Sequence, residues 1–187
     1  MEKHKLVALS LVCLSAGLLF AGAVGTGIKK PDFTRTTIDI GIVVSDVEKT
    51  ARFYKNALGF TEAPGFDVSS RMAGDSGLAR YMAFSVRVLA LDNAPTATKI
   101  KIMQFPEADP KKVDNRFIHS SLGFSYLTVF VSDMNAAVQR LENAGAAPVK
   151  EPYRLGGSGD FLTLVKDPDG NIIELVGPGK SPASNPR

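Results

Sequence analysis

Apolar and polar residues alternate from Thr36 to Val44, which predicts a strand with one buried face. From Val47 to Asn56 the apolar positions change to a helical spacing. Ser45 precedes this segment and Glu48 follows Ser45 by three residues, a pattern typical of a capped helix start. Three more strands are predicted, at Phe60–Ala63, Tyr81–Val88 and Lys99–Phe105.

Glycine and aspartate gather at Arg71–Leu78, so we expect a mobile loop there. The polar segment Pro106–Ser121 is expected to link the first half of the chain to the second. The pattern therefore predicts a strand, a helix and three strands before the linker.

The same order of elements returns in the second half of the chain. Val44-Ser45-Asp46 recurs as Val131-Ser132-Asp133, 87 positions later, and Asn56 matches Asn143 at the same offset. An internal repeat of this kind implies two copies of one supersecondary unit. The second copy predicts a strand at Phe124–Val131, a helix from Ser132 to Ala144, and strands near Ala147–Lys150, Asp160–Lys166 and Ile172–Val176.

The segment Asp167–Val176 combines a turn with a short buried strand. Its first five residues are Asp-Pro-Asp-Gly-Asn, which favour tight turns, and the strand after them is mostly apolar. Glu174 interrupts that strand. A buried carboxylate is costly unless it is paired or binds a metal, so Glu174 is the first candidate for a functional residue.

These motifs resemble the vicinal oxygen chelate superfamily, which holds glyoxalases, bleomycin-resistance proteins and extradiol dioxygenases. The resemblance is carried by Ile42–Val47 with Phe53–Phe60, by Tyr126–Gly145 and by Asp167–Val176. It implies an α+β fold in which two βαβββ modules, at about 36–105 and 124–177, form a mixed, curved eight-stranded sheet around a cleft. The domain would span residues 36–177.

The resemblance also implies a metal site, with His or Gln on the first and fifth strands and usually Glu on the fourth and eighth. The matching positions here hold Asp39, Lys101, Tyr126 and Glu174. Only Glu174 keeps the usual residue, and a protonated lysine repels a cation. We therefore expect no cofactor and a degenerate metal site, with a bound divalent metal as the alternative.

Lys101 suggests a specific replacement for the metal. We hypothesise that its ammonium lies between Asp39 and Glu174, with the Tyr126 hydroxyl in the same cluster. The alternative is a different register of the fourth strand, with Lys101 in solvent and Glu174 only hydrogen-bonded. By alternation, the cleft face also carries Met103, Thr128 and Phe130, which we predict to contact a ligand.

The first functional hypothesis is a protein that binds a small organic molecule in the cleft between the modules. The alternative is a glyoxalase-like lyase or isomerase, either metal-dependent or with Glu174 as general base. Whether the protein is an enzyme stays open at this point. The resemblance also allows a homodimer. A net charge of +3 without a long basic run gives no sign of nucleic-acid binding.

The N-terminus predicts export. Lys3 and Lys5 precede the uncharged segment Leu6–Phe20, and Ala21-Gly22-Ala23 fits a cleavage site, so residues 1–23 are predicted to be a signal peptide. The protein would then be periplasmic or extracellular. The alternative is an uncleaved membrane anchor at residues 6–28. Residues 24–35 are expected to be a linker and residues 178–187 a disordered tail.

Overall fold

The computed structural model describes residues 33–157 and 159–179. The predicted signal peptide and most of the predicted tail lie outside these residues. In this part of the chain no helix is both long and apolar enough to cross a membrane. The elements are β1 (Ile40–Val43), α1 (Val47–Asn56), β2 (Thr61–Val68), α2 (Ser70–Asp75), β3 (Phe84–Ala90), β4 (Lys99–Met103), β5 (Tyr126–Phe130), α3 (Met134–Asn143), β6 (Tyr153–Arg154), β7 (Asp160–Lys166) and β8 (Ile172–Pro178).

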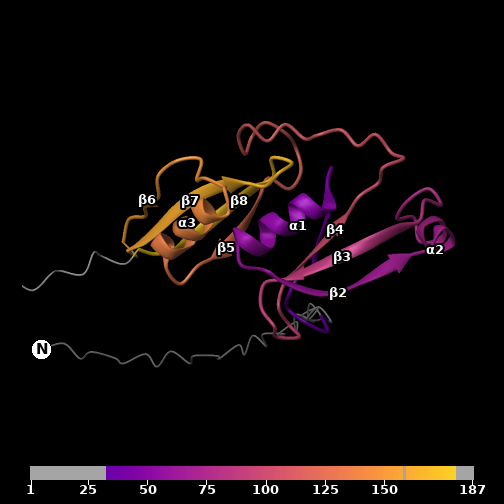
Figure 1. Cartoon of the computed structure of the whole chain (residues 1–187), viewed down its shortest axis with the longest axis horizontal. Coiled ribbons are helices and arrows are strands. Elements are labelled where there is room, and N and C mark those ends of the chain that lie inside the picture. Colours follow the sequence, from indigo (N-terminus) through magenta and orange to yellow (C-terminus); the bar gives the residue numbers. More distant parts are fainter. Residues whose placement is uncertain (1–32, 158, 180–187) are drawn as a thin grey trace, which may run out of the picture. The chain divides into compact units, whose positions relative to one another are not determined.

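The strands form two four-stranded sheets with the same topology (Figure 1). The orders are β1-β4-β3-β2 and β5-β8-β7-β6. In each sheet the first and last strands of the module pair in parallel, and the remaining pairs are antiparallel. This confirms the two βαβββ modules and the α+β class. Among the described strands no ladder joins the two modules, so the eight strands form two mixed sheets and not one.

The helices α1 and α3 occupy equivalent positions, since both of their ends are 87 residues apart. The predicted caps are wrong by one residue. The side chain of Asp46 accepts the Lys49 N–H, and the side chain of Asp133 accepts two N–H groups at the start of α3. Aspartate is at least as good a cap as serine, and here it leaves the hydroxyl of Ser45 free for another contact.

Other predictions about elements also need correction. β2 continues to Val68, beyond the predicted end at Ala63, and β3 begins at Phe84, and not at Tyr81. The first strand begins at Ile40, and not at Thr36. Within the expected mobile loop lies α2, because the Ser69 side chain caps it and Ala73 is fully buried beneath the sheet residues Val86 and Val88. No strand forms at 147–150 in the described chain. The edge strand of the second sheet is the two-residue β6, which pairs with β7.

One hydrophobic core joins the modules. It contains buried residues of α1 and β4 from the first module and of α3 and β8 from the second, among them Tyr54, Ile102, Leu141 and Leu175. The opposite face of the first sheet carries a smaller cluster with Val86 and Val88. Val88 and Leu89 are neighbours in β3 but belong to different clusters, as expected for a strand whose side chains alternate between faces.

The turn between β7 and β8 connects the modules through polar contacts. Asp167 is 5% exposed, and its carboxylate accepts the N–H groups of Asp169 and Asn171 and the hydroxyl of Tyr54. Gly170 has a φ of 93°, which suits glycine at this point of the turn. The Asp169 carboxylate accepts the N–H and the hydroxyl of Ser45, at 2.9 and 2.5 Å. The turn therefore holds the start of α1.

Candidate ligand-binding site

The family-equivalent positions lie on the sheet faces that point away from the shared core. In the first module, Gly41 pairs with Lys101 while Ile40 pairs with Ile100, and Ile100 is buried in the core. Lys101 therefore points to the opposite face. In the second module, Thr128 pairs with Glu174, and Leu175, the next residue, is buried in the core. Glu174 likewise points away from the helix.

Asp39 forms the centre of a charged group at the start of β1. Its Oδ2 lies 3.1 Å from the Lys101 amine and 3.2 Å from a guanidinium nitrogen of Arg35. The Asp39 side chain is 11% exposed, against 35% for Lys101. Burial alone would raise the pKa of Asp39. The hydrogen bond and charge of Lys101 and the charge of Arg35 lower it by more, so the pKa lies below the usual value. Asp39 therefore carries a negative charge near neutral pH.

Only one oxygen of Asp39 is used in these contacts. Its Oδ1 is buried and has no hydrogen-bond partner among the described residues, and the same holds for the hydroxyl oxygen of Thr37. Buried polar atoms without partners are uncommon because each one loses its hydration without compensation. Both residues line the same cavity.

The cavity has a volume of about 660 Å³ and is lined by both modules. One wall is Thr36–Ile42, and the other is Phe124–Leu127 with Asn171 and Ile172. A smaller cavity of about 240 Å³ shares Tyr126 and Leu127 and reaches Thr128. Together they give an apolar space with a few polar groups, as ligand pockets usually have.

The second module contributes a different arrangement around Glu174. Its Oε1 accepts the hydroxyl of Thr128 at 2.8 Å. Within the described chain no ion pair joins Glu174 to Lys101, and the amine of Lys101 pairs with Asp39 alone among the carboxylates. The structure thus places the Lys101 ammonium beside one carboxylate of the hypothesised cluster, while Glu174 has a hydroxyl partner.

The remaining predicted residues occupy separate places. Tyr126 lines the cavity opposite Asp39 and is 47% exposed. Met103 packs against the smaller hydrophobic cluster of the first sheet. Phe130 is 78% exposed at the end of β5. The cavity therefore brings together Asp39 and Tyr126, and it does not include Lys101, Met103, Phe130 or Glu174 in its lining.

Sequence reasoning did not identify Arg35 and Thr37 as site residues. Both belong to the irregular segment before β1; Arg35 lies outside the predicted strand, and Thr37 lies inside it at a position that was not given a role. The one sequence signal was a positive charge at Arg35, four residues before Asp39. Across residues 33–157 and 159–179, no group of three or more His, Cys, Asp or Glu side chains is placed to hold a metal ion.

Comparison with known proteins supports the fold and the family. The model of the Glyoxalase/Bleomycin resistance protein/Dioxygenase superfamily matches residues 37–175. A lactoylglutathione lyase from Arabidopsis thaliana is 32% identical over 60 residues, and a putative lactoylglutathione lyase from Brassica oleracea var. gemmifera matches to the same extent. These matches cover 32% of this chain and 21% of each relative, so the aligned part is about a fifth of those proteins.

Solved structures agree with the observed fold. A glyoxalase family protein from Bacillus cereus superposes with a TM-score of 0.64 at 21% identity, covering 80% of this chain and 97% of that one. Glyoxalase I from Zea mays superposes with a TM-score of 0.58 at 17% identity, covering 78% of this chain and 46% of that one. At these identities the likeness is one of fold.

Proposed function

Because the chain belongs to the glyoxalase/bleomycin resistance protein/dioxygenase superfamily, whose fold serves several chemistries, we propose a function from the site itself: it binds a small organic molecule in the cavity between its modules, without a metal. The observation that carries this proposal is a cavity whose lining includes Asp39, a carboxylate with one oxygen, Oδ1, that has no hydrogen-bond partner among the described residues. An anionic oxygen at an apolar wall is a strong acceptor for a ligand hydroxyl, amide or amine.

The shape and lining of the cavity favour a mostly apolar ligand. A volume of about 660 Å³ falls within the range of small-molecule sites. Ile38, Ile40 and Ile172 supply apolar surface, and Thr37 adds a hydroxyl that has no partner. We expect the ligand to place an apolar body between β1 and β5 and a donor group at Asp39.

The residues at the four family positions do not fit a divalent metal. Two of them are carboxylates, but the ammonium of Lys101 takes the place of the third ligand and already binds one oxygen of Asp39. A protonated lysine has no lone pair to donate and repels a metal ion. Glu174 binds the Thr128 hydroxyl, and a neutral tyrosine is a weak ligand. We therefore derive no step of the function through a metal.

A ligand screen tests the proposal. Neutral organic compounds with a donor group should raise the thermal stability of the protein, and the same compounds should bind Asp39→Asn about tenfold more weakly, because a charge-assisted hydrogen bond is lost. Asp92→Asn, at an exposed turn, is the matched control and should bind like the wild type. Equal binding to wild type and Asp39→Asn would contradict the proposal.

The second candidate function is that of a glyoxalase-like lyase or isomerase. It is favoured by the matches to two lactoylglutathione lyases. In this case Glu174 would act as general base, with its carboxylate held by the Thr128 hydroxyl. An assay for formation or cleavage of lactoylglutathione, with and without added Ni²⁺ or Zn²⁺, decides the matter. Turnover that disappears in Glu174→Gln would support this function over simple binding.

We further propose that the protein is exported and that residues 1–23 are removed. The support is the sequence pattern of the N-terminus, with two lysines before an uncharged apolar segment and small residues after it. The intact mass of the protein recovered from the producing cells tests this. A mass that includes residues 1–23, in a protein that stays with the membrane fraction, would favour the anchor.

A further inference from the structure

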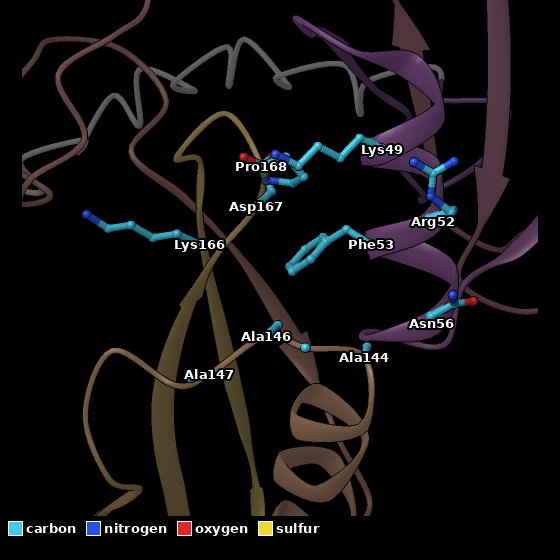
Figure 2. A pocket seen from close by; sticks show the side chains of 11 residues that line it. Lys49, Arg52, Phe53, Asn56, Ala144, Ala146, Ala147, Lys166, Asp167 and Pro168 are labelled. Atoms are coloured by element: carbon cyan, nitrogen blue, oxygen red, sulfur yellow. The ribbon is translucent and has the colours of Figure 1, made fainter.

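A second pocket lies along the outer face of α1, separate from the cavity near Asp39. Lys49, Arg52, Phe53 and Asn56 stand at positions i, i+3, i+4 and i+7 of α1, so they share one face of the helix. The pocket has a volume of about 380 Å³, and its other wall is the segment after α3 together with Asp167 and Pro168. Figure 2 shows the Phe53 ring pointing from α1 into this space and the Lys49 side chain reaching towards Pro168.

The internal repeat shows why this pocket is open. Phe53 is 87 residues before Arg140, which occupies the same position on α3. The Arg140 guanidinium donates to the Ala57 carbonyl at 3.1 Å and lies against Gly59. It therefore fills the corresponding space in the other half of the molecule. Phe53 itself has no guanidinium that could donate to the carbonyl of Ala144, the residue equivalent to Ala57.

Some charged side chains around the pocket have partners within the protein, and others do not. In the described chain, neither Lys49 nor Arg52 has an ion-pair partner. The one carboxylate of the lining, Asp167, is engaged in the turn by two backbone N–H groups, Asn171 and Tyr54. The Lys166 amine donates to the Asn115 carbonyl, and Figure 2 shows its side chain pointing away from the pocket. Two cations on α1 therefore face a space without a free anion.

We propose that this pocket binds a small organic anion, a carboxylate with a compact apolar or aromatic body. The carboxylate would lie between Lys49 and Arg52, and the Asn56 amide could donate a further hydrogen bond. The apolar body would pack on Phe53 and Pro168, since a half-buried aromatic ring offers a flat apolar surface. This pocket and the Asp39 cavity differ in the charge that they attract. Lys49 and Arg52 attract an anion here, whereas Asp39 attracts a hydrogen-bond donor or a cation.

Titration with benzoate, followed by ¹H–¹⁵N NMR, tests the proposal. Saturable shifts should appear at the backbone amides of residues 49–56 and 144–147, and benzyl alcohol, which lacks the charge, should leave these amides unchanged. The double variant K49Q/R52Q should bind benzoate about tenfold more weakly, because two exposed charge interactions are removed. Both side chains are exposed, so the variant should fold normally.

The matched control is K111Q, which removes an exposed positive charge outside the pocket lining and should bind benzoate like the wild type. Unchanged affinity in K49Q/R52Q would overturn the proposal. So would benzoate shifts that map to the lining of the Asp39 cavity, at residues 36–42 and 124–127, and not to α1. The proposal stands or falls independently of the proposed function.

Discussion

At the scale of single residues, Asp39 connects the charged group at the start of β1 with the proposed ligand cavity. It carries two cationic contacts on one oxygen and none on the other, and it lies in the wall of the larger cavity. Lys101 supplies one of the two cations, at a position where the family usually has a carboxylate. With lysine at this position, Asp39 has an ammonium as its partner in an ion pair, and its second oxygen has no partner among the described residues.

Lys101→Gln should raise the pKa of Asp39 towards its ordinary value. The hydrogen bond and charge of Lys101 oppose the effect of burial in the wild type, and the variant keeps only Arg35 and Lys99 as nearby cations. Titration of the Asp39 carboxyl carbon by ¹³C NMR measures this shift. An unchanged Asp39 pKa in the variant would mean that the 3.1 Å contact does not persist in solution.

Glu62 gives the protein a pH-dependent contribution to stability. Hydrogen bonds from Arg87 and then from Lys55 lower the pKa of Glu62 to about 2. A carboxyl with a depressed pKa contributes stability that is full above its unfolded value of 4.5 and is lost as the pH falls towards 2. The Glu62 side chain is 37% exposed, so solvent screening limits the effect to less than about 1 kcal/mol.

The variant Glu62→Gln should therefore be less stable than the wild type at pH 6, and the difference should shrink between pH 4.5 and pH 2. Urea unfolding at several pH values measures it. A difference that stays constant over that interval would show that the ion pairs with Arg87 and Lys55 do not form.

At the scale of elements, the turn between β7 and β8 links the two modules through polar contacts. Asp167→Ala should lower the free energy of unfolding by about 2–3 kcal/mol, because two partly buried N–H groups and the buried Tyr54 hydroxyl lose their acceptor. Asp114→Ala is the control, since Asp114 is exposed and, within the described part of the chain, its carboxylate bonds to Arg116 alone. It should change stability by less than about 0.5 kcal/mol. Similar effects for both variants would refute the role given to the turn.

The sequence predicted elements well where local chemistry decides them. The internal repeat predicted both α1 and α3. The predicted bounds of β7 and the predicted start of β8 agree with the structure. The sequence pattern did not predict α2. Gly74, Asp75 and Gly77 favour a loop, and this signal was stronger than the Ser69 cap and the single buried alanine that the helix contributes. The expected strand at 147–150 was wrong because Val149 makes a single backbone hydrogen bond to β7 there and not a continuous ladder.

At the scale of the whole molecule, the shared core makes the two modules depend on each other. Leu141 of α3 is fully buried in the same cluster as Tyr54 and Ile102 of the first module. Leu141→Ala should lower the free energy of unfolding by about 2–5 kcal/mol. Hydrogen exchange should show that protection of β4 and of β8 falls by the same amount. Loss of protection in the second module alone would show that the modules unfold separately.

The candidate site was less predictable than the fold, for a physical reason. The positions Asp39, Lys101, Tyr126 and Glu174 came from the resemblance to the family, and the strand pairing places the side chains of Lys101 and Glu174 on the faces away from the shared core. Which of them meet depends on distances between modules, which alternation does not contain. The Asp39–Lys101 ion pair was predicted, and its residues belong to neighbouring parts of one sheet. The hydrogen bond from Thr128 to Glu174 and the partnerless oxygen of Asp39 became visible only in the structure.

The central claim, a ligand site without a metal, is tested most directly by the metal content of the purified protein. The protein is incubated with equimolar Ni²⁺, Zn²⁺ and Mn²⁺, desalted, and analysed by inductively coupled plasma mass spectrometry. The account predicts far less than one ion per chain, because the Lys101 ammonium already pairs with Asp39. One tightly held ion per chain, lost in both Asp39→Asn and Glu174→Gln, would contradict it.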